Sequence, residues 1–203
     1  MILLVFSVCM TVAFLSVLFL LNFNRDPNRR IPEGKNIVSP ADGKVFSILD
    51  TEDKKTIVKK RFFGKIRTLL QKNRETYLIS IFMNPFNVHV QRTPLEGKVE
   101  RVRYAKGLFH NAGTLLATGE NEKCETVLST KIGRVKVIQI AGFLTNRISN
   151  YLKEGYCYPK GMRMGKIHFG SQVTLIIPKK KVKSLKIKVG DRVKAGESIL
   201  ATY

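Results

Sequence analysis

The stretch SPADGKV at residues 39–45 runs into an apolar segment, and TPLEGKV at 93–99 repeats its pattern. Both stretches carry a proline, an acidic residue and then Gly-Lys-Val. Proline, Asp and glycine favour a tight turn, and the β-branched residues that follow favour an extended strand. Each stretch therefore predicts a turn that opens a β-strand.

Short apolar runs bounded by turn residues continue through the rest of the chain. Runs of this length and spacing are typical of strands in an all-β domain. The expected strands are 44–49, 77–83, 87–90, 98–104, 134–141, 172–177, 185–189 and 198–202. One helix is expected at 143–152. The predicted fold class is mainly β, a β-sandwich or barrel-like domain with a few short helices.

A second repeat lies in the glycines. Gly155 and Gly161 recur at the same interval as Gly190 and Gly196, and each pair precedes an apolar run. Regularly placed glycines indicate turns that need a positive φ. The run VGDRVKAGESIL at 189–200 resembles the turn-strand pattern of lipoyl- and biotin-carrier half-barrels. Ordinary turns of a compact β-sandwich account for the repeats as well.

Residues 2–21 carry no charge, proline or glycine. A helix of this length, at about 1.5 Å per residue, matches a hydrocarbon core of about 30 Å. We expect a membrane anchor helix at 1–22, followed by one domain at 23–203. A cleaved signal peptide would begin with basic residues and end at small ones, which this segment does not; a buried helix of a soluble protein is the third interpretation.

Basic residues follow the apolar segment, and none precedes it: Arg25, Arg29 and Arg30. The positive-inside rule then places the domain on the cytoplasmic side of the cell membrane.

The formal charge of the chain is +21 at pH 7. Nucleic acid and an anionic membrane surface are both partners for such a charge, and the anchor favours the membrane. The densest basic stretch, 54–74, fits either an amphipathic helix lying on lipid or an ordinary surface helix. Three cysteines without a CxxC pair predict neither a disulfide framework nor a zinc site. No cofactor-binding motif or metal-ligand spacing is present.

The pair Gly170-Ser171 precedes an apolar strand near the carboxyl end. A serine hydroxyl beside a strained peptide could attack its own preceding carbonyl, and glycine would tolerate that geometry. Such a step needs a base for the serine proton and donors for the oxyanion. On its own, the pair is as well explained by a bulge.

Five segments in order resemble the phosphatidylserine decarboxylase proenzyme family in its short form. They are FNRDPNRRIPEGKNIVSPADGKV (23–45), IFMNPFNVHVQRTPLEGKV (81–99), GLFHNA (107–112) with ENE (120–122), IQIAGFLTNRI (138–148) and MGKIHFGSQVTLIIP (164–178).

This resemblance implies self-cleavage between Gly170 and Ser171, giving a β chain, 1–170, and an α chain, 171–203, which stay associated. Ser171 would become a covalent pyruvoyl group, the only cofactor expected. That group would form a Schiff base with the serine amine of phosphatidylserine, release carbon dioxide and leave phosphatidylethanolamine. The implied partners are phosphatidylserine and an anionic membrane surface, without nucleic acid; a homo-oligomer stays open.

The resemblance also gives roles to Ser171, His89 and Asp42. His89 matches the family's motif histidine and would take the Ser171 proton. Asp42 would fix the His89 tautomer, by the logic of an Asp-His-Ser triad. Without the resemblance, a strand histidine and a turn aspartate are sufficient interpretations.

Some positions depart from the family pattern. His168 and Gln172 stand where arginine is more usual, so head-group affinity or choice could differ here. His110 is a secondary acid/base candidate.

Two alternatives of other kinds stay open. One is a pyruvoyl decarboxylase of another serine-headed lipid, such as archaetidylserine. The other is a membrane-anchored, carrier-like binding module that never cleaves itself; it lacks the lysine context that carriers need.

Overall fold

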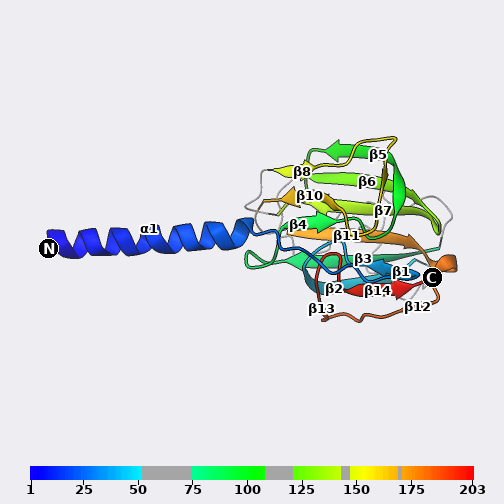
Figure 1. Cartoon of the computed structure of the whole chain (residues 1–203), viewed down its shortest axis with the longest axis horizontal. Helices are drawn as coiled ribbons and strands as arrows, with labels where there is room; N and C mark the ends of the chain where they lie inside the picture. The colour runs from blue at the N-terminus through cyan, green and yellow to red at the C-terminus, as the bar shows by residue number, and fades with distance from the viewer. Residues whose placement is uncertain (52–74, 108–120, 143–146, 169–170) are drawn as a thin grey trace.

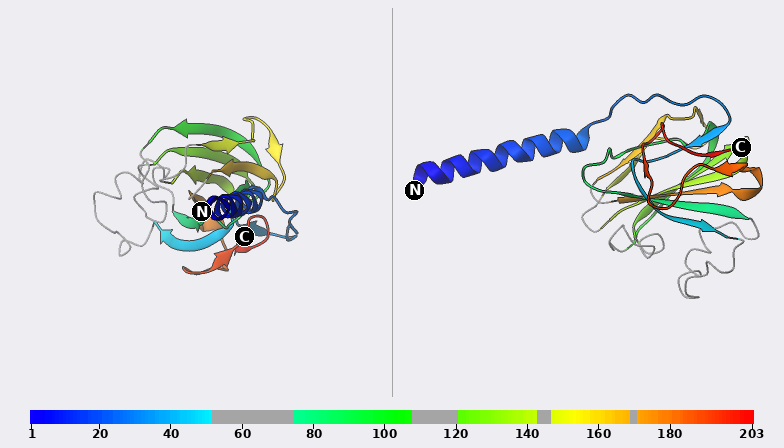
Figure 2. Two further views of the ribbon diagram at one scale, coloured as in Figure 1. Left: turned by 90° about the vertical axis from the view of Figure 1, so that its left-hand side faces the viewer. Right: turned by 90° about the horizontal axis from the view of Figure 1, so that it is seen from below.

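A computed structural model describes residues 1–51, 75–107, 121–142, 147–168 and 171–203. A long amino-terminal helix, α1 (Ile2–Asn24), projects from a domain built of strands (Figures 1 and 2). The prediction of a mainly β domain behind one apolar helix is confirmed.

The strands of the described residues form one eight-stranded and two three-stranded sheets. The large sheet has the order β13-β2-β3-β11-β7-β6-β5-β9, and the small ones are β1-β14-β12 and β4-β10-β8. The elements are β1 (Asn36–Val38), β2 (Gly43–Asp50), β3 (Thr76–Met83), β4 (Val90–Arg92), β5 (Gly97–Ala105), β6 (Lys123–Thr130), β7 (Gly133–Ile140), β8 (Ile148–Asn150), β9 (Cys157–Tyr158), β10 (Arg163–Ile167), β11 (Ser171–Pro178), η2, a 3-10 helix (Lys179–Lys181), β12 (Ser184–Leu185), β13 (Arg192–Val193) and β14 (Ile199–Thr202).

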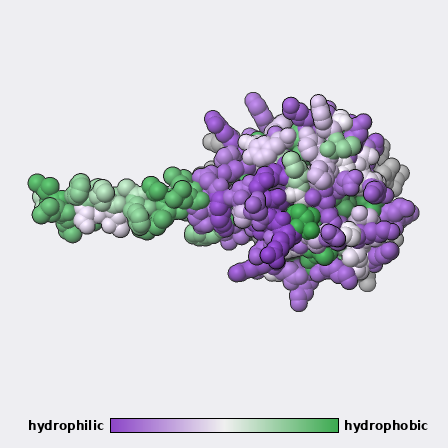
Figure 3. All heavy atoms as spheres, in the orientation of Figure 1, coloured by the Kyte–Doolittle hydropathy of each residue, from purple (hydrophilic) through white to green (hydrophobic). Residues whose placement is uncertain are grey.

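The α1 helix is long and apolar enough to cross a membrane, and none of its most apolar window is buried in the protein. Its apolar surface runs up to the hydrophilic surface of the domain (Figure 3). A helix that leaves its whole apolar window exposed is not the buried core helix of a soluble domain. Only Phe23, at its carboxyl end, is buried.

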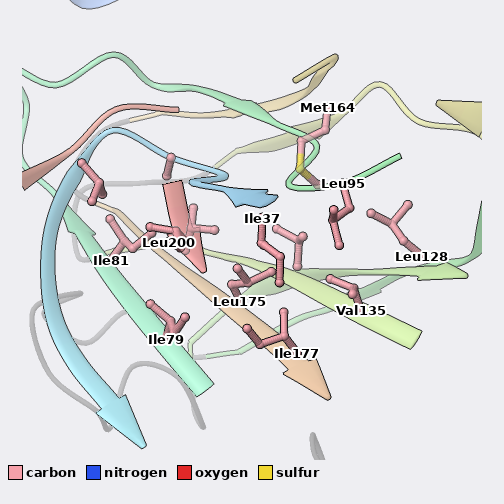
Figure 4. Close-up of a cluster of buried hydrophobic side chains, with 14 of the residues drawn as sticks. Ile37, Ile79, Ile81, Leu95, Leu128, Val135, Met164, Leu175, Ile177 and Leu200 are labelled. Carbon is pink, nitrogen blue, oxygen red and sulfur yellow. The ribbon is translucent and has the colours of Figure 1, made fainter. Parts of the chain in front are cut away.

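The core lies between the large sheet and the smaller ones. Strand β11 is buried along almost its whole length and pairs antiparallel with β3 on one side and β7 on the other. Its side chains Leu175 and Ile177 point toward Ile37 of β1 (Figure 4). A strand buried on both faces is almost continuously apolar, as SQVTLIIP is after its first two residues. The strand that begins at Ser171 is therefore central to the fold.

The repeats seen in the sequence correspond to an approximate two-fold symmetry. Val38 N–H donates to the Pro94 carbonyl, and Arg92 N–H donates to the Pro40 carbonyl. In one half Gly190 N–H donates to Val45 and Gly196 N–H to Ser39; in the other Gly155 N–H donates to Val99 and Gly161 N–H to Thr93. All four glycines have positive φ, so the predicted turns are confirmed.

Most predicted strands are present with small shifts, and some predictions are wrong. No strand covers 87–89 or 186–189. The helix expected at 143–152 is wrong where the structure describes it, because Ile148–Asn150 pairs with β10 as strand β8. The strands that were not expected are β1, β6, β9, β10 and β13. The basic stretch 54–74 lies outside the described residues.

Candidate functional site

Ser171 begins the central strand β11 and is completely buried. It lies opposite Met83 in the antiparallel ladder with β3. Its hydroxyl donates to Met83 Sδ at 3.4 Å. A thioether is a weak acceptor, so this contact leaves the hydroxyl proton readily transferable. The preceding Gly170, and with it the predicted cleavage bond, lies outside the described residues, as does His110.

His89 lies just before β4, beside the segment that leads to Ser171. The Ile167 N–H, at the end of β10, donates to the His89 carbonyl at 3.2 Å. The ring Nδ1 lies 2.8 Å from the Asn87 carbonyl oxygen. Since a carbonyl only accepts, Nδ1 carries the proton and Nε2 holds a lone pair. That Nε2 is buried and has no hydrogen-bond partner among the residues that the structure describes.

The surroundings of His89 keep its ring neutral. Burial, the largest cause, acts together with the positive charges of Lys166 and Arg25 to lower its pKa from 6.5 to about 4. The hydrogen bond to Asn87 acts in the opposite sense. At neutral pH, His89 is therefore an uncharged base.

Met83 and Gln91 connect His89 with Ser171. The Gln91 amide nitrogen lies 2.8 Å from the His89 carbonyl oxygen and 3.7 Å from Met83 Sδ, the atom that the Ser171 hydroxyl contacts. Gln91 Oε1 accepts from Gln139 Nε2 at 2.9 Å. These contacts link the His89 backbone carbonyl, through Gln91 and Met83, to the Ser171 hydroxyl. Gln91 and Gln139 were missed from the sequence, although two glutamines inside apolar strands are an unusual signal.

Asp42 lies elsewhere in the uncleaved chain. Its carboxylate accepts from Arg29 Nη2 at 2.9 and 3.0 Å and from the Ala195 N–H at 2.7 Å. The expected Asp42–His89 hydrogen bond is absent, and the Asn87 carbonyl fixes the His89 tautomer instead. The reason is that a buried carboxylate is satisfied by a guanidinium and a backbone donor within reach. The turn role is present, and a catalytic part for Asp42 stays a prediction.

The end of α1 packs directly on the candidate base. The Phe23 and His89 ring centroids are 4.3 Å apart. Lys166 Nζ lies 5.7 Å from the Phe23 ring centroid and donates to Asn24 Oδ1 at 2.6 Å. Phe23 was missed from the sequence because it stands there as the first residue after the expected anchor, with no sign of a contact with His89.

Positive charge surrounds this end of the site. Lys166, Arg25 and His168 all act on His89, and Lys166 and Arg147 lower the pKa of His168 after burial, the largest cause. This field would attract an anionic head group. Gln172, by contrast, is buried in β11 and its amide donates to Thr174 Oγ1 at 2.9 Å.

The arrangement offers a buried hydroxyl, a neutral imidazole with a free lone pair and a cationic rim. Among the described residues, no group of three or more His, Cys, Asp or Glu side chains could hold a metal ion. A nucleophile activated by a neighbouring base is the chemistry this set supports best. A carbonyl cofactor made from Ser171 itself would fit, because Ser171 is fully buried at the start of β11.

Comparison with known proteins gives one consistent answer. The family profile described as phosphatidylserine decarboxylase matches residues 17–201. The chain is 37% identical over 199 residues to a phosphatidylserine decarboxylase proenzyme of Desulfotalea psychrophila, covering 96% of this chain and 85% of that protein. It is 37% identical over 190 residues to one of Burkholderia ambifaria, covering 93% and 80%.

Proposed function

The chain belongs to the phosphatidylserine decarboxylase proenzyme family, and from this we infer that it is a carboxy-lyase that decarboxylates phosphatidylserine to phosphatidylethanolamine after cleaving itself. Two features of His89 support the proposal most: its buried Nε2 has no hydrogen-bond partner among the described residues, and its backbone carbonyl is linked through Gln91 and Met83 to the buried Ser171 hydroxyl.

In the proposed cleavage, the Ser171 oxygen attacks the Gly170 carbonyl carbon while His89 Nε2 takes the hydroxyl proton. The new C–O bond replaces the C–N bond, and the proton passes to the released Ser171 nitrogen, giving an ester. Loss of the Ser171 α-proton then breaks the Cβ–O bond and frees the carboxyl end of the β chain. Water replaces the nitrogen, ammonia leaves, and a pyruvoyl group remains at the start of the α chain. A base that is neutral at pH 7 suits the first step.

The pyruvoyl group would supply an electron-withdrawing carbonyl that stabilises the carbanion left when carbon dioxide departs. This chain's own contribution would be to hold that end still and to orient the lipid. Two ladders, to β3 and to β7, fix the strand that begins at residue 171. Lys166 and Arg25 lie on the side where a phosphate or carboxylate would be held.

The same ladders support association of the α and β chains after cleavage. Strand β11 pairs on both sides with β-chain strands, and β13 and β14 pair with β2 and β1. We further propose that α1 anchors the protein in the cell membrane with the domain on the cytoplasmic side, supported by Arg25, Arg29 and Arg30.

Intact mass spectrometry of the purified protein tests this proposal. We expect two chains, 1–170 and 171–203, the second with a pyruvoyl end that resists Edman degradation and reacts with a hydrazine. Ser171→Ala should remain a single chain of about the 23.0 kDa precursor mass. Ser80→Ala, at another buried serine of the same sheet, should still cleave. A stable, uncleaved wild-type chain in lipid, or cleavage of Ser171→Ala, would refute the assignment.

The enzymatic part is tested on the cleaved protein. Carbon dioxide should be released from vesicles that contain phosphatidylserine, and reduction of the carbonyl with borohydride should abolish the release. Turnover that survives such reduction would exclude the pyruvoyl chemistry.

A further inference from the structure

The turn between β3 and β4 contacts the carboxyl end of α1. Phe86, in this turn, is 66% exposed, more than any other large hydrophobic residue that the structure describes after α1. Its ring stands edge-on to the Phe19 ring of α1, with centroids 6.3 Å apart. Its carbonyl accepts from Arg25 Nη2 at 2.6 Å. The most exposed apolar side chain of the domain is therefore placed against the anchor.

The turn holds Phe86 in this position. Asn84 N–H donates to Asn87 Oδ1, Phe86 N–H donates to Asn84 Oδ1, both at 2.9 Å, and Asn87 N–H donates to the Asn84 carbonyl at 3.0 Å. Side-chain acceptors of this kind stabilise short turns locally. Phe86 is thus presented outward by a braced turn, and its exposure is built into the local structure.

The anchor gives the depth of Phe86. The 23 residues of α1 have a length of about 35 Å, slightly more than a hydrocarbon core of about 30 Å. Polar residues Asn22, Asn24 and Arg25 mark the end that must lie among the head groups. Phe19 lies about one and a half turns before that end, near the boundary between acyl chains and head groups. A ring that touches Phe19 is at the same depth.

We propose that the 84–87 turn is a second contact with the bilayer, with Phe86 inserted among the lipids beside α1. Aromatic side chains concentrate at this boundary in membrane proteins. The nearby cations Arg25 and Lys166 would lie at head-group level, where an anionic leaflet attracts them. The turn and the anchor would then hold His89, which follows the turn directly, at the layer that contains lipid head groups. This inference rests on the proposed anchoring by α1.

The test uses a property of the composition, because the chain contains no tryptophan. Phe86→Trp therefore places a single fluorescent reporter at the proposed contact. The full chain is inserted into phosphatidylcholine vesicles whose acyl chains are brominated either close to the glycerol or close to the tail end. We expect blue-shifted emission and strong quenching, greatest with the bromines close to the glycerol.

Tyr156→Trp is the matched control, since Tyr156 is 62% exposed. Its carbonyl accepts from Val99 at the beginning of β5, and β5 runs from the far end of the domain toward α1 (Figure 1). The anchor holds both variants to the vesicle, so a difference between them reports depth and not binding. The control should emit as in water and be quenched several-fold less. Equal emission and quenching in the two variants would overturn the proposal.

A second variant tests the consequence for substrate capture. Phe86→Ser should lower turnover of phosphatidylserine in vesicles several-fold, while turnover of a water-soluble short-chain phosphatidylserine stays unchanged. An equal loss on both substrates would count against a membrane role. The fluorescence measurement needs neither cleavage nor turnover, so its outcome is independent of the proposed reaction.

Discussion

Phe23 sets the environment of His89, and replacing it should move the pH dependence of self-cleavage. The two ring centroids are 4.3 Å apart, and Phe23 is the only buried residue of α1. Burial is the largest cause that lowers the pKa of His89 from 6.5 to about 4. Phe23→Ala removes one wall of this burial, so water reaches the ring and the pKa should rise toward its ordinary value.

The size of the effect follows from the fraction of neutral imidazole. With a pKa of about 4, about 97% of His89 is neutral at about pH 5.5. If the pKa returned fully to 6.5, about 9% would be neutral at the same pH. Because only the neutral ring accepts the Ser171 proton, cleavage in the variant should slow by up to about tenfold between about pH 8 and pH 5.5. The wild type should hardly change over that interval.

The assay follows the conversion of freshly synthesised precursor in lipid nanodiscs, resolved by electrophoresis and intact mass. Phe19→Ala is the control, because it removes a ring one turn earlier in α1 that packs on Phe23 and Phe86. The ratio of rates at the two pH values is the readout, so a uniform loss of rate from weakened packing does not imitate the effect. The reasoning is refuted if the ratio in Phe23→Ala equals that of the wild type.

Three further results are expected. In the uncleaved Ser171→Ala protein, the free energy of unfolding should fall as the pH drops from about 6.5 to about 4, by up to about 1.4 kcal/mol per pH unit. The reason is that the unfolded chain protonates His89 in this range and the folded chain does not. Urea midpoints measured across this range check the prediction, and a flat profile would contradict it. Gly43→Ala should destabilise by about 2 kcal/mol or more, since a Cβ at its positive φ meets the Phe82 carbonyl, while Gly155→Ala, also at a positive φ but with open space around it, should cost about 1 kcal/mol; equal midpoint shifts would contradict this. After cleavage the two chains should copurify through detergent washes and separate only in denaturant, and release of the 171–203 chain under native conditions would contradict the pairing of β11 described above.

The turns were predictable because their chemistry is local. Gly155, Gly161, Gly190 and Gly196 needed only their spacing to be identified, and each has positive φ. The strand starts at Gly43 and Gly97 followed from the repeated Gly-Lys-Val in the same way. Residues whose conformation is decided by their own neighbours can be read directly from the sequence.

Two errors in the predicted secondary structure have identifiable physical causes. Ile148–Asn150 can form a helical turn on its own sequence, but the free backbone edge of β10 draws it into a ladder with Gly165–Ile167. The strand expected from residue 87 begins only at Val90, because Asn84 and Asn87 bond to each other in a turn. Tertiary pairing overrides local propensity in the first case, and a local turn delays the start of the strand in the second.

The sequence motifs named the candidate site residues, but not their hydrogen-bond partners. The Ser171 hydroxyl contacts Met83 Sδ, which Gln91 links to the His89 backbone carbonyl, and proton transfer between the two residues stays a prediction. Nothing in the sequence decides whether Asp42 binds His89 or Arg29. Neither residue is a sequence neighbour of Asp42, and both can donate a hydrogen bond to a carboxylate. The structure gives Asp42 to Arg29. The contribution of Phe23 depends on the angle at which α1 meets the domain, which has no local signal.

The two interlocked halves also have a meaning for ancestry. The crossed bonds from Val38 to Pro94 and from Arg92 to Pro40 have the reciprocal form of an isologous dimer interface. One chain thus contains the geometry of a homodimer of a shorter unit, as gene duplication and fusion would leave it. The copies have since diverged: Asp42 is buried and bound by Arg29, whereas its symmetry mate Glu96 is exposed. Specialisation of one copy left the other free to serve as scaffold.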